Sequence, residues 1–147
     1  MLAIVYHSQS GRCAQLAQAA AEGAEKRTEV KVYRAVDADT QVWLQHKGVL
    51  LIAAENSAAL AGDFKAFLDR TLYPFHRTGG VVPAALLINA GNDGSGAVKQ
   101  FERIARGFPL RLMVPSTIIV GPVGAAERGR AHEWGEGLAE GVSLGIF

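Results

Sequence analysis

The chain opens with a strand, a glycine-containing turn and a helix, an arrangement that builds an anion site. The run Leu2–Tyr6 is short and apolar, as expected of a strand buried on both faces. A polar turn, Ser8–Arg12, follows, and the alanine-rich segment from Gly11 to Lys26 favours a helix. The first turn of a helix carries unpaired backbone N–H groups, and the helix dipole favours negative charge there. The stretch therefore predicts a phosphate-binding loop, in which Gly11 lets the backbone come close to the bound group.

A simpler interpretation of the same turn stays open. Ser10 can act as the N-cap of the helix with nothing bound, an arrangement that is common in proteins. The turn is not a Walker loop, because no Gly-Lys-Ser/Thr follows it. It is not the dinucleotide-binding fingerprint either, because it lacks the repeated glycines of that pattern.

Strand-like and helical segments alternate along the rest of the chain. Thr28–Arg34 alternates polar and apolar residues, which predicts a strand at the edge of a sheet. Later apolar runs predict further strands, and apolar residues at helical spacing predict the helices between them. These strands are expected at Gly48–Ala54, Val81–Asn89 and Leu110–Val120, the last interrupted at Pro115, and the helices at Val42–Leu44, 60–72, 97–106 and 125–144. The helix over 60–72 is expected to end at Tyr73-Pro74, because the residue before a proline avoids the helical conformation.

This order of elements predicts a single α/β domain over residues 1–147. Strands that alternate with helices form a parallel sheet covered on both faces, a three-layer α/β/α sandwich. In a five-stranded sheet of order 2-1-3-4-5 the first, third and fourth strands are neighbours, and ligands bind beyond the carboxyl ends where the strand order reverses. The loops Ser8–Cys13, Glu55–Leu60 and Ala90–Gly96 follow those three strands, so we expect them to converge on one crevice.

Composition narrows the classes of function. Hydrophobic residues make up 49% of the chain and charged residues 20%, which is typical of a globular protein with a large core. The formal net charge of +1 gives no field to attract nucleic acid. One cysteine allows no internal disulfide, and no spacing of His and Cys resembles a metal site. The first residues do not resemble a signal peptide and no apolar run approaches the ~18 residues of a membrane span, so we expect a cytoplasmic protein.

Three segments together resemble the flavodoxin-like superfamily, and within it the FMN-dependent NAD(P)H reductases and quinone oxidoreductases. Ser8-Gln9-Ser10-Gly11-Arg12-Cys13 is similar to the family's hydroxyl-rich loop for the FMN phosphate. The segment from Glu55 to Arg70 is similar to the middle loop and its helix, with the pattern Gly-x-x-Lys-x-Phe-x-Asp-Arg over 62–70. Ala90–Gly96 is similar to the loop at the flavin edge, and the resemblance spans nearly the whole chain.

The resemblance implies an FMN site in which no side chain is catalytic, because the flavin performs the chemistry. Backbone N–H groups of the first loop, with the hydroxyls of Ser8 and Ser10, would hold the phosphate, and Asn56 would bond a ring edge. Glycines of the third loop would lie close to the pyrimidine edge. The implied cofactor-binding residues are Ser8, Gln9, Ser10, Gly11, Arg12, Cys13, Ala54, Glu55, Asn56, Ser57, Ala90, Gly91, Asn92, Asp93 and Gly94.

The chain departs from the family pattern at two of these loops and in its charge. The family usually has a threonine or serine where Cys13 stands, so one phosphate hydroxyl is replaced by a weaker thiol donor, which Arg12 can offset as a cation near the phosphate. The middle loop lacks the usual proline and aromatic residue, and the chain lacks the acidic character of flavodoxin electron carriers. The departures favour the reductase branch and leave the retention of FMN open.

The resemblance implies an NAD(P)H-dependent oxidoreductase that passes electrons through FMN to a quinone or another small acceptor. Two alternatives stay open: a flavodoxin-type electron carrier without a substrate of its own, and a flavin-free interaction domain of the same fold. The apolar share and the loop Tyr73–Val82 favour a homodimer or homotetramer.

Three residues of the first, middle and third loops carry further expectations. Cys13 stands at a helix N-terminus, and we expect a packed small residue there rather than a redox thiol. A carboxylate beside a flavin opposes its anionic reduced state. Glu55 and Asp93 are therefore both expected to point to solvent.

Overall fold

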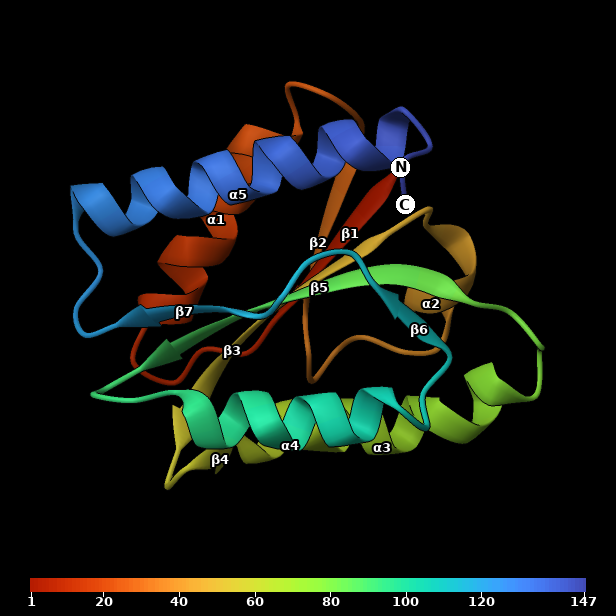
Figure 1. Cartoon of the computed structure of the whole chain (residues 1–147), viewed down its shortest axis with the longest axis horizontal. Helices are drawn as coiled ribbons and strands as arrows, with labels where there is room; N and C mark the ends of the chain where they lie inside the picture. The colour runs from red at the N-terminus through yellow and green to blue at the C-terminus, as the bar shows by residue number, and fades with distance from the viewer.

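Strands and helices alternate along the chain in the predicted order, and the computed structural model describes all residues 1–147 (Figure 1). The strands are β1 (Leu2–Tyr6), β2 (Val30–Arg34), β3 (Val49–Asn56), β4 (Ala59–Leu60), β5 (Val82–Ala90), β6 (Leu110–Leu112) and β7 (Thr117–Val120). The helices are α1 (Arg12–Ala24), α2 (Gln41–Gln45), α3 (Gly62–His76), α4 (Ser95–Ala105) and α5 (Ala125–Ser143). None of the helices has both the length and the apolar character that a membrane crossing requires.

The parallel sheet has the predicted order, with its fifth strand in two pieces. Its path is β2-β1-β3-β5-β6, and β7 continues alongside β5 beyond β6. The break between β6 and β7 contains Pro115, which has no N–H to donate to a sheet ladder. β2 lies at the edge, as its alternating sequence predicts. β4 lies outside this path, so β5 is the fourth strand, and β6 and β7 together form the fifth. The predicted order 2-1-3-4-5 is therefore confirmed.

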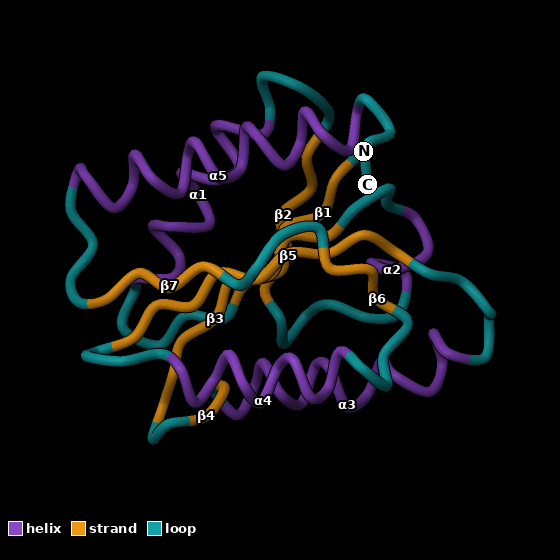
Figure 2. Tube along the Cα trace, in the orientation of Figure 1, coloured by secondary structure: helices purple, strands orange, loops and turns teal.

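Two separate cores cover the two faces of the sheet. Successive strand residues point to opposite faces. In β1, Ala3 and Val5 accordingly join the core with α3 and α4, while Leu2 and Ile4 join the core with α1 and α5. Figure 2 shows these two helical layers on either side of the strands. The three-layer α/β/α architecture is thus confirmed.

Helices α1 and α5 pack with their backbones in direct contact. A Cβ atom built on Gly135 would lie 2.1 Å from the backbone oxygen of Ala20. A Cβ atom on Gly23 would lie 2.1 Å from the backbone oxygen of His132. Only glycine fits at these two positions, so Gly23 and Gly135 determine how closely α1 and α5 approach each other.

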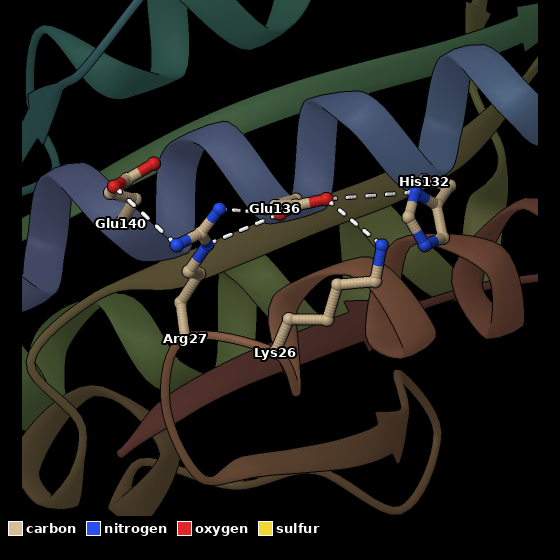
Figure 3. Close-up of polar contacts among 5 residues, drawn as sticks. All are labelled: Lys26, Arg27, His132, Glu136 and Glu140. Carbon is tan, nitrogen blue, oxygen red and sulfur yellow. Dashed lines mark hydrogen bonds and ion pairs between the residues drawn. The ribbon is translucent and has the colours of Figure 1, made fainter.

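A cluster of charged side chains links α5 to the residues that directly follow α1 (Figure 3). Glu136 of α5 accepts hydrogen bonds from the Arg27 guanidinium at 2.7 Å and from Lys26 Nζ at 3.2 Å. Arg27 also lies 3.7 Å from Glu140, and His132 Nδ1 lies 4.0 Å from Glu136. The hydrogen bonds from Arg27 and Lys26 hold the pKa of the Glu136 carboxyl below its usual value.

Helix α3 differs from the prediction at both ends. It continues through Pro74 to His76 rather than ending at Tyr73-Pro74. The next residue, Phe75, is buried, and its ring lies 6.0 Å from that of Trp43 and 6.1 Å from that of Phe108. Burial of this ring favours one more helical turn and offsets the backbone hydrogen bond that proline cannot make. At the other end, Leu60 lies in β4, although it is buried in the core that the helical pattern predicted.

The Lys-x-Phe-x-Asp-Arg part of the middle motif, residues 65–70, stabilises the fold. Lys65 pairs with Asp69 at 2.7 Å along the outer side of α3. The Arg70 guanidinium donates to the backbone oxygens of Ala35 and Ala38, and thereby ties the segment between β2 and α2 to α3.

Candidate functional site

A cleft of about 280 Å³ lies at the carboxyl end of the sheet, where β1, β3 and β5 meet. Its lining residues come from the loop after β1, from α1, and from the ends of β3 and β5. They are Ser8, Gln9, Ser10, Cys13, Ala54, Asn56 and Asn89. Six of these seven were implied from the sequence, and the structure brings them together at the point where the strand order reverses.

The loop after β1 leaves the start of α1 open. The N-cap is Gly11 in the left-handed conformation (φ 94°), and no side chain caps the helix. The interpretation of Ser10 as the N-cap is therefore wrong. Ser8 Oγ instead accepts the N–H of Gly11 at 3.1 Å. The backbone N–H groups of residues 9, 10 and 12–14 make no hydrogen bond within the protein, which is the arrangement that binds anions.

The middle loop is a tight antiparallel hairpin rather than an open loop. Beyond the sheet, the end of β3 pairs with β4, so that Glu55 faces Leu60 and Asn56 faces Ala59. The turn residues Ser57 and Ala58 both have left-handed backbones, with φ of 50° and 59°. Two-residue hairpins require this conformation, but glycine or asparagine usually supplies it. The sequence therefore predicts a loop here but not this two-residue turn, and each of these residues carries backbone strain.

Glu55 fastens this hairpin to the start of α4. Its carboxylate accepts the N–H of Gly94 at 2.9 Å and the N–H of Ala97 at 3.0 Å. From α4, Gln100 Oε1 accepts the N–H of Leu60 at 2.7 Å. The expectation that Glu55 points to solvent is wrong. The N–H groups at the start of α4 have no partner within the helix, and a carboxylate that bonds them is more stable there than in solvent.

Asn56 links the hairpin to the loop after β1, because its side-chain amide donates to Gln9 Oε1 at 3.1 Å. Asp93, in contrast, is exposed as expected, and its carboxylate accepts the Ser95 hydroxyl at 2.7 Å. The bonds made by Asn56 and Glu55 connect the loops that follow β1, β3 and β5 into one assembly.

The third loop is shorter than predicted and lies beside the cleft. Helix α4 begins at Ser95, and Gly94 is its N-cap (φ 93°). Gly96 packs against the hairpin turn, where a Cβ atom would lie 2.2 Å from the backbone oxygen of Ala58. Gly91, Asn92 and Asp93 are exposed and do not line the cleft. Two helix starts therefore border the site: that of α4 already holds the Glu55 carboxylate, and that of α1 is free.

Cys13 and Asn89 form the buried side of the cleft. Cys13 is 2% exposed, and burial raises the pKa of its thiol to about 12. This confirms the expectation of a packed residue. Asn89 is 5% exposed, and its amide donates to the backbone oxygens of Ile119 at 2.9 Å and Gly121 at 3.1 Å. Sequence reasoning missed Asn89, although a polar residue near the end of a long apolar strand was a usable signal.

A larger groove, of about 490 Å³, lies between α1 and α5. Apart from Ala19 and Gly129 it is lined by polar and charged side chains, all of which are exposed or half-buried. No group of three or more His, Cys, Asp and Glu side chains in the protein is placed to hold a metal ion. The smaller cleft is therefore the candidate site, because buried polar groups and free backbone donors converge only there.

Comparisons with solved structures identify the fold. The chain matches an archaeal flavodoxin with a TM-score of 0.84 and 21% identity, covering 97% of this chain and 99% of the other. A WrbA-like flavodoxin from Agrobacterium tumefaciens matches with a TM-score of 0.79 and 18% identity over 97% of both chains. The flavodiiron protein of Giardia intestinalis matches with a TM-score of 0.81 and 16% identity, over 98% of this chain and 36% of that one. The sequence matches no family model and no curated protein. The chain thus has the flavodoxin-like fold.

Proposed function

We propose that this protein binds FMN in the 280 Å³ cleft and acts as an electron-transferring flavoprotein. The observation that carries the proposal is the open start of α1, where a row of backbone N–H groups without partners faces a cleft at the reversal point of the sheet. The similarity to flavodoxins supports the same assignment. When bound, FMN supplies the transfer of electrons, and the protein's own groups bind and orient it.

Each side of the cleft has a separate part in this proposal. The free backbone donors of residues 9, 10, 12 and 13 and the hydroxyls of Ser8 and Ser10 bind the phosphate, and Arg12 adds positive charge. The flavin ring lies where the cleft opens, bordered by Ala54 to Ser57 and by Ala90 to Gly94, the second of which lies beside the cleft rather than in its lining. Gly94 contributes close approach rather than a donor, because its N–H already bonds Glu55. Cys13 contributes packing, since its buried thiol stays protonated at neutral pH.

A titration of the purified protein with FMN and with riboflavin tests this proposal. Riboflavin has the same ring and lacks the phosphate, so it serves as the matched ligand. A hydrogen bond to a charged group contributes about 1.5–3 kcal/mol, and losing even one such bond corresponds to about a tenfold change in Kd. We expect FMN to bind at least tenfold more tightly than riboflavin. Absence of a spectral change at micromolar FMN refutes the proposal and favours the flavin-free interaction domain.

We further propose that NAD(P)H is the reductant and that a quinone or similar small molecule is the acceptor. This proposal rests on the open ring-side wall: the hairpin turn presents Ser57 and Ala58, both exposed, and no aromatic side chain lines the cleft. An uncovered cofactor leaves room for a small reactant to stack on it. Stopped-flow mixing with NADPH and NADH, followed by a quinone, tests the assignment.

An electron carrier without its own substrate is the second candidate, and the match to the archaeal flavodoxin favours it. The two candidates give opposite results in the same experiment. Rapid bleaching of the flavin by NAD(P)H supports the oxidoreductase. A holoprotein that dithionite reduces but neither nicotinamide reduces is the carrier.

A homodimer or homotetramer is proposed from exposed apolar side chains near the end of α3. Tyr73 is 72% exposed and Val81 is 66% exposed. Light scattering of the holoprotein at several concentrations measures the assembly state, and a mass of one chain throughout the series refutes this proposal.

A further inference from the structure

Asn89 carries a hydrogen-bond acceptor that no group of the protein uses. Its side-chain nitrogen donates to the backbone oxygens of Ile119 and Gly121, and these two bonds use both of its hydrogens. Because a backbone oxygen can only accept, the orientation of the amide is fixed, and the oxygen Oδ1 must lie on the other side. Oδ1 makes no hydrogen bond within the protein, although the residue is only 5% exposed.

The free oxygen belongs to the candidate cleft. Asn89 lines it together with Ser8, Ser10 and Cys13. The fully buried side-chain atoms without a partner are Trp43 Nε1, His46 Nε2 and Trp134 Nε1, so Asn89 Oδ1, which also has no partner, is accessible from the cleft. Neither serine hydroxyl bonds Asn89 in the structure. The cleft therefore presents a fixed acceptor beside a set of backbone donors.

These two kinds of group require complementary groups on one ligand. The backbone N–H groups at the start of α1 select an anion such as phosphate, which accepts hydrogen bonds. Asn89 Oδ1 needs a donor, and a phosphate dianion has none. The cleft volume of about 280 Å³ is just below the roughly 300–1,000 Å³ of whole ligand sites, so the cleft fits a phosphate and the chain that carries it, and a larger group such as a flavin ring extends beyond it. In a phosphate ester the donors on that chain are hydroxyls.

We propose that Asn89 determines ligand specificity by accepting a hydrogen bond from a hydroxyl of a polyol phosphate. This inference rests on the proposed function, because the ribityl phosphate part of FMN is such a group. Asn89 thereby distinguishes a polyol phosphate from inorganic phosphate and from a phosphate on an apolar chain. The two bonds to Ile119 and Gly121 hold the acceptor in place before the ligand arrives, so little ordering accompanies binding.

The test uses three small phosphates and the protein without flavin. Ribitol 5-phosphate carries the hydroxyls, n-pentyl phosphate has a chain of the same length without them, and inorganic phosphate has no chain. Dissociation constants are measured by NMR titration of the labelled protein. We expect ribitol 5-phosphate to bind at least tenfold more tightly than n-pentyl phosphate. In Asn89→Ala the two should bind within threefold of each other, with inorganic phosphate unchanged.

Thr71→Val is the matched control. Thr71 is buried in α3, which contributes nothing to the cleft, and its hydroxyl bonds the Phe67 backbone oxygen at 2.8 Å. This variant loses a buried hydrogen bond as Asn89→Ala does, and it should keep the tenfold preference. A preference that persists in Asn89→Ala overturns the proposal.

The wild-type comparison decides the question if Asn89→Ala does not fold. Equal binding of ribitol 5-phosphate and n-pentyl phosphate to the wild type overturns the role of Asn89, even where FMN itself binds. Failure of the proposed function is a different result, in which the protein binds neither FMN nor any of the three phosphates.

Discussion

Replacing Glu55 tests whether the site is assembled by one carboxylate. In Glu55→Ala the N–H groups of Gly94 and Ala97 lose their partner. Each bond to a charged group contributes about 1.5–3 kcal/mol, but the start of α4 is partly reached by water, and lost helix caps typically cost about 0.5–2 kcal/mol. We therefore expect the free energy of unfolding to fall by about 2–4 kcal/mol, between these two estimates.

Urea unfolding of the flavin-free protein at pH 7, followed by tryptophan fluorescence, measures this change. Glu55→Gln keeps the shape but can accept at only one oxygen, so it should lose about half as much. Asp93→Asn removes the same charge from the neighbouring loop, where the carboxylate is exposed, and should change stability by less than about 0.5 kcal/mol.

Hydrogen exchange supplies a local readout for the same variants. The Leu60 amide, which donates to Gln100 Oε1 of α4, should exchange faster in both Glu55 variants and at the wild-type rate in Asp93→Asn. The reasoning is refuted if Glu55→Ala unfolds within 0.5 kcal/mol of the wild type (a threshold set by the scatter of surface substitutions) and Leu60 keeps its protection.

Three further predictions concern the helical layer, acid stability and the thiol. Gly135→Ala places a methyl group 2.1 Å from the Ala20 backbone oxygen and should destabilise the protein by about 1–3 kcal/mol in thermal unfolding. Gly137 lies on the open side of the same helix, so Gly137→Ala should be neutral or stabilising. His46 is 6% exposed and burial lowers its pKa, so the unfolded state binds more protons and the free energy of unfolding should fall as the pH drops below about 6.5. In His46→Phe the urea midpoint should change less between pH 7 and pH 5 than it does in the wild type. An equal change of the midpoint in both proteins contradicts this prediction. With its pKa raised to about 12, the Cys13 thiol should react with a disulfide reagent at pH 8 only after denaturant is added.

The sequence was sufficient for the sheet and for the first loop because their signals are local. Apolar runs such as Leu2–Tyr6 identify buried strands, and the Ser8–Arg12 turn before an alanine-rich segment identifies the start of α1 within one short segment. The strand order followed from alternation of strands and helices together with the family resemblance. These features depend little on distant residues.

Features that depend on distant partners could not be found this way. Glu55 bonds N–H groups that lie 39 and 42 residues away, and only the folded hairpin brings them together. The hairpin itself uses Ser57 and Ala58 at positions where local rules expect glycine or asparagine. Pro74 stays helical because Phe75 is buried against side chains from α2 and from the segment after α4. In each case tertiary contact outweighs local preference.

The close packing of α1 on α5 has a consequence for synthesis of the protein. Arg27, just after α1, pairs with Glu136, 109 residues further along the chain, and α1, which presents the open N–H groups, packs closely against α5. A nascent chain that has already left the ribosome through β5 contains the whole cleft lining but lacks the helix that braces α1. We therefore expect ligand capture to begin only after α5 has emerged from the ribosome, well after all the residues that line the cleft have been made.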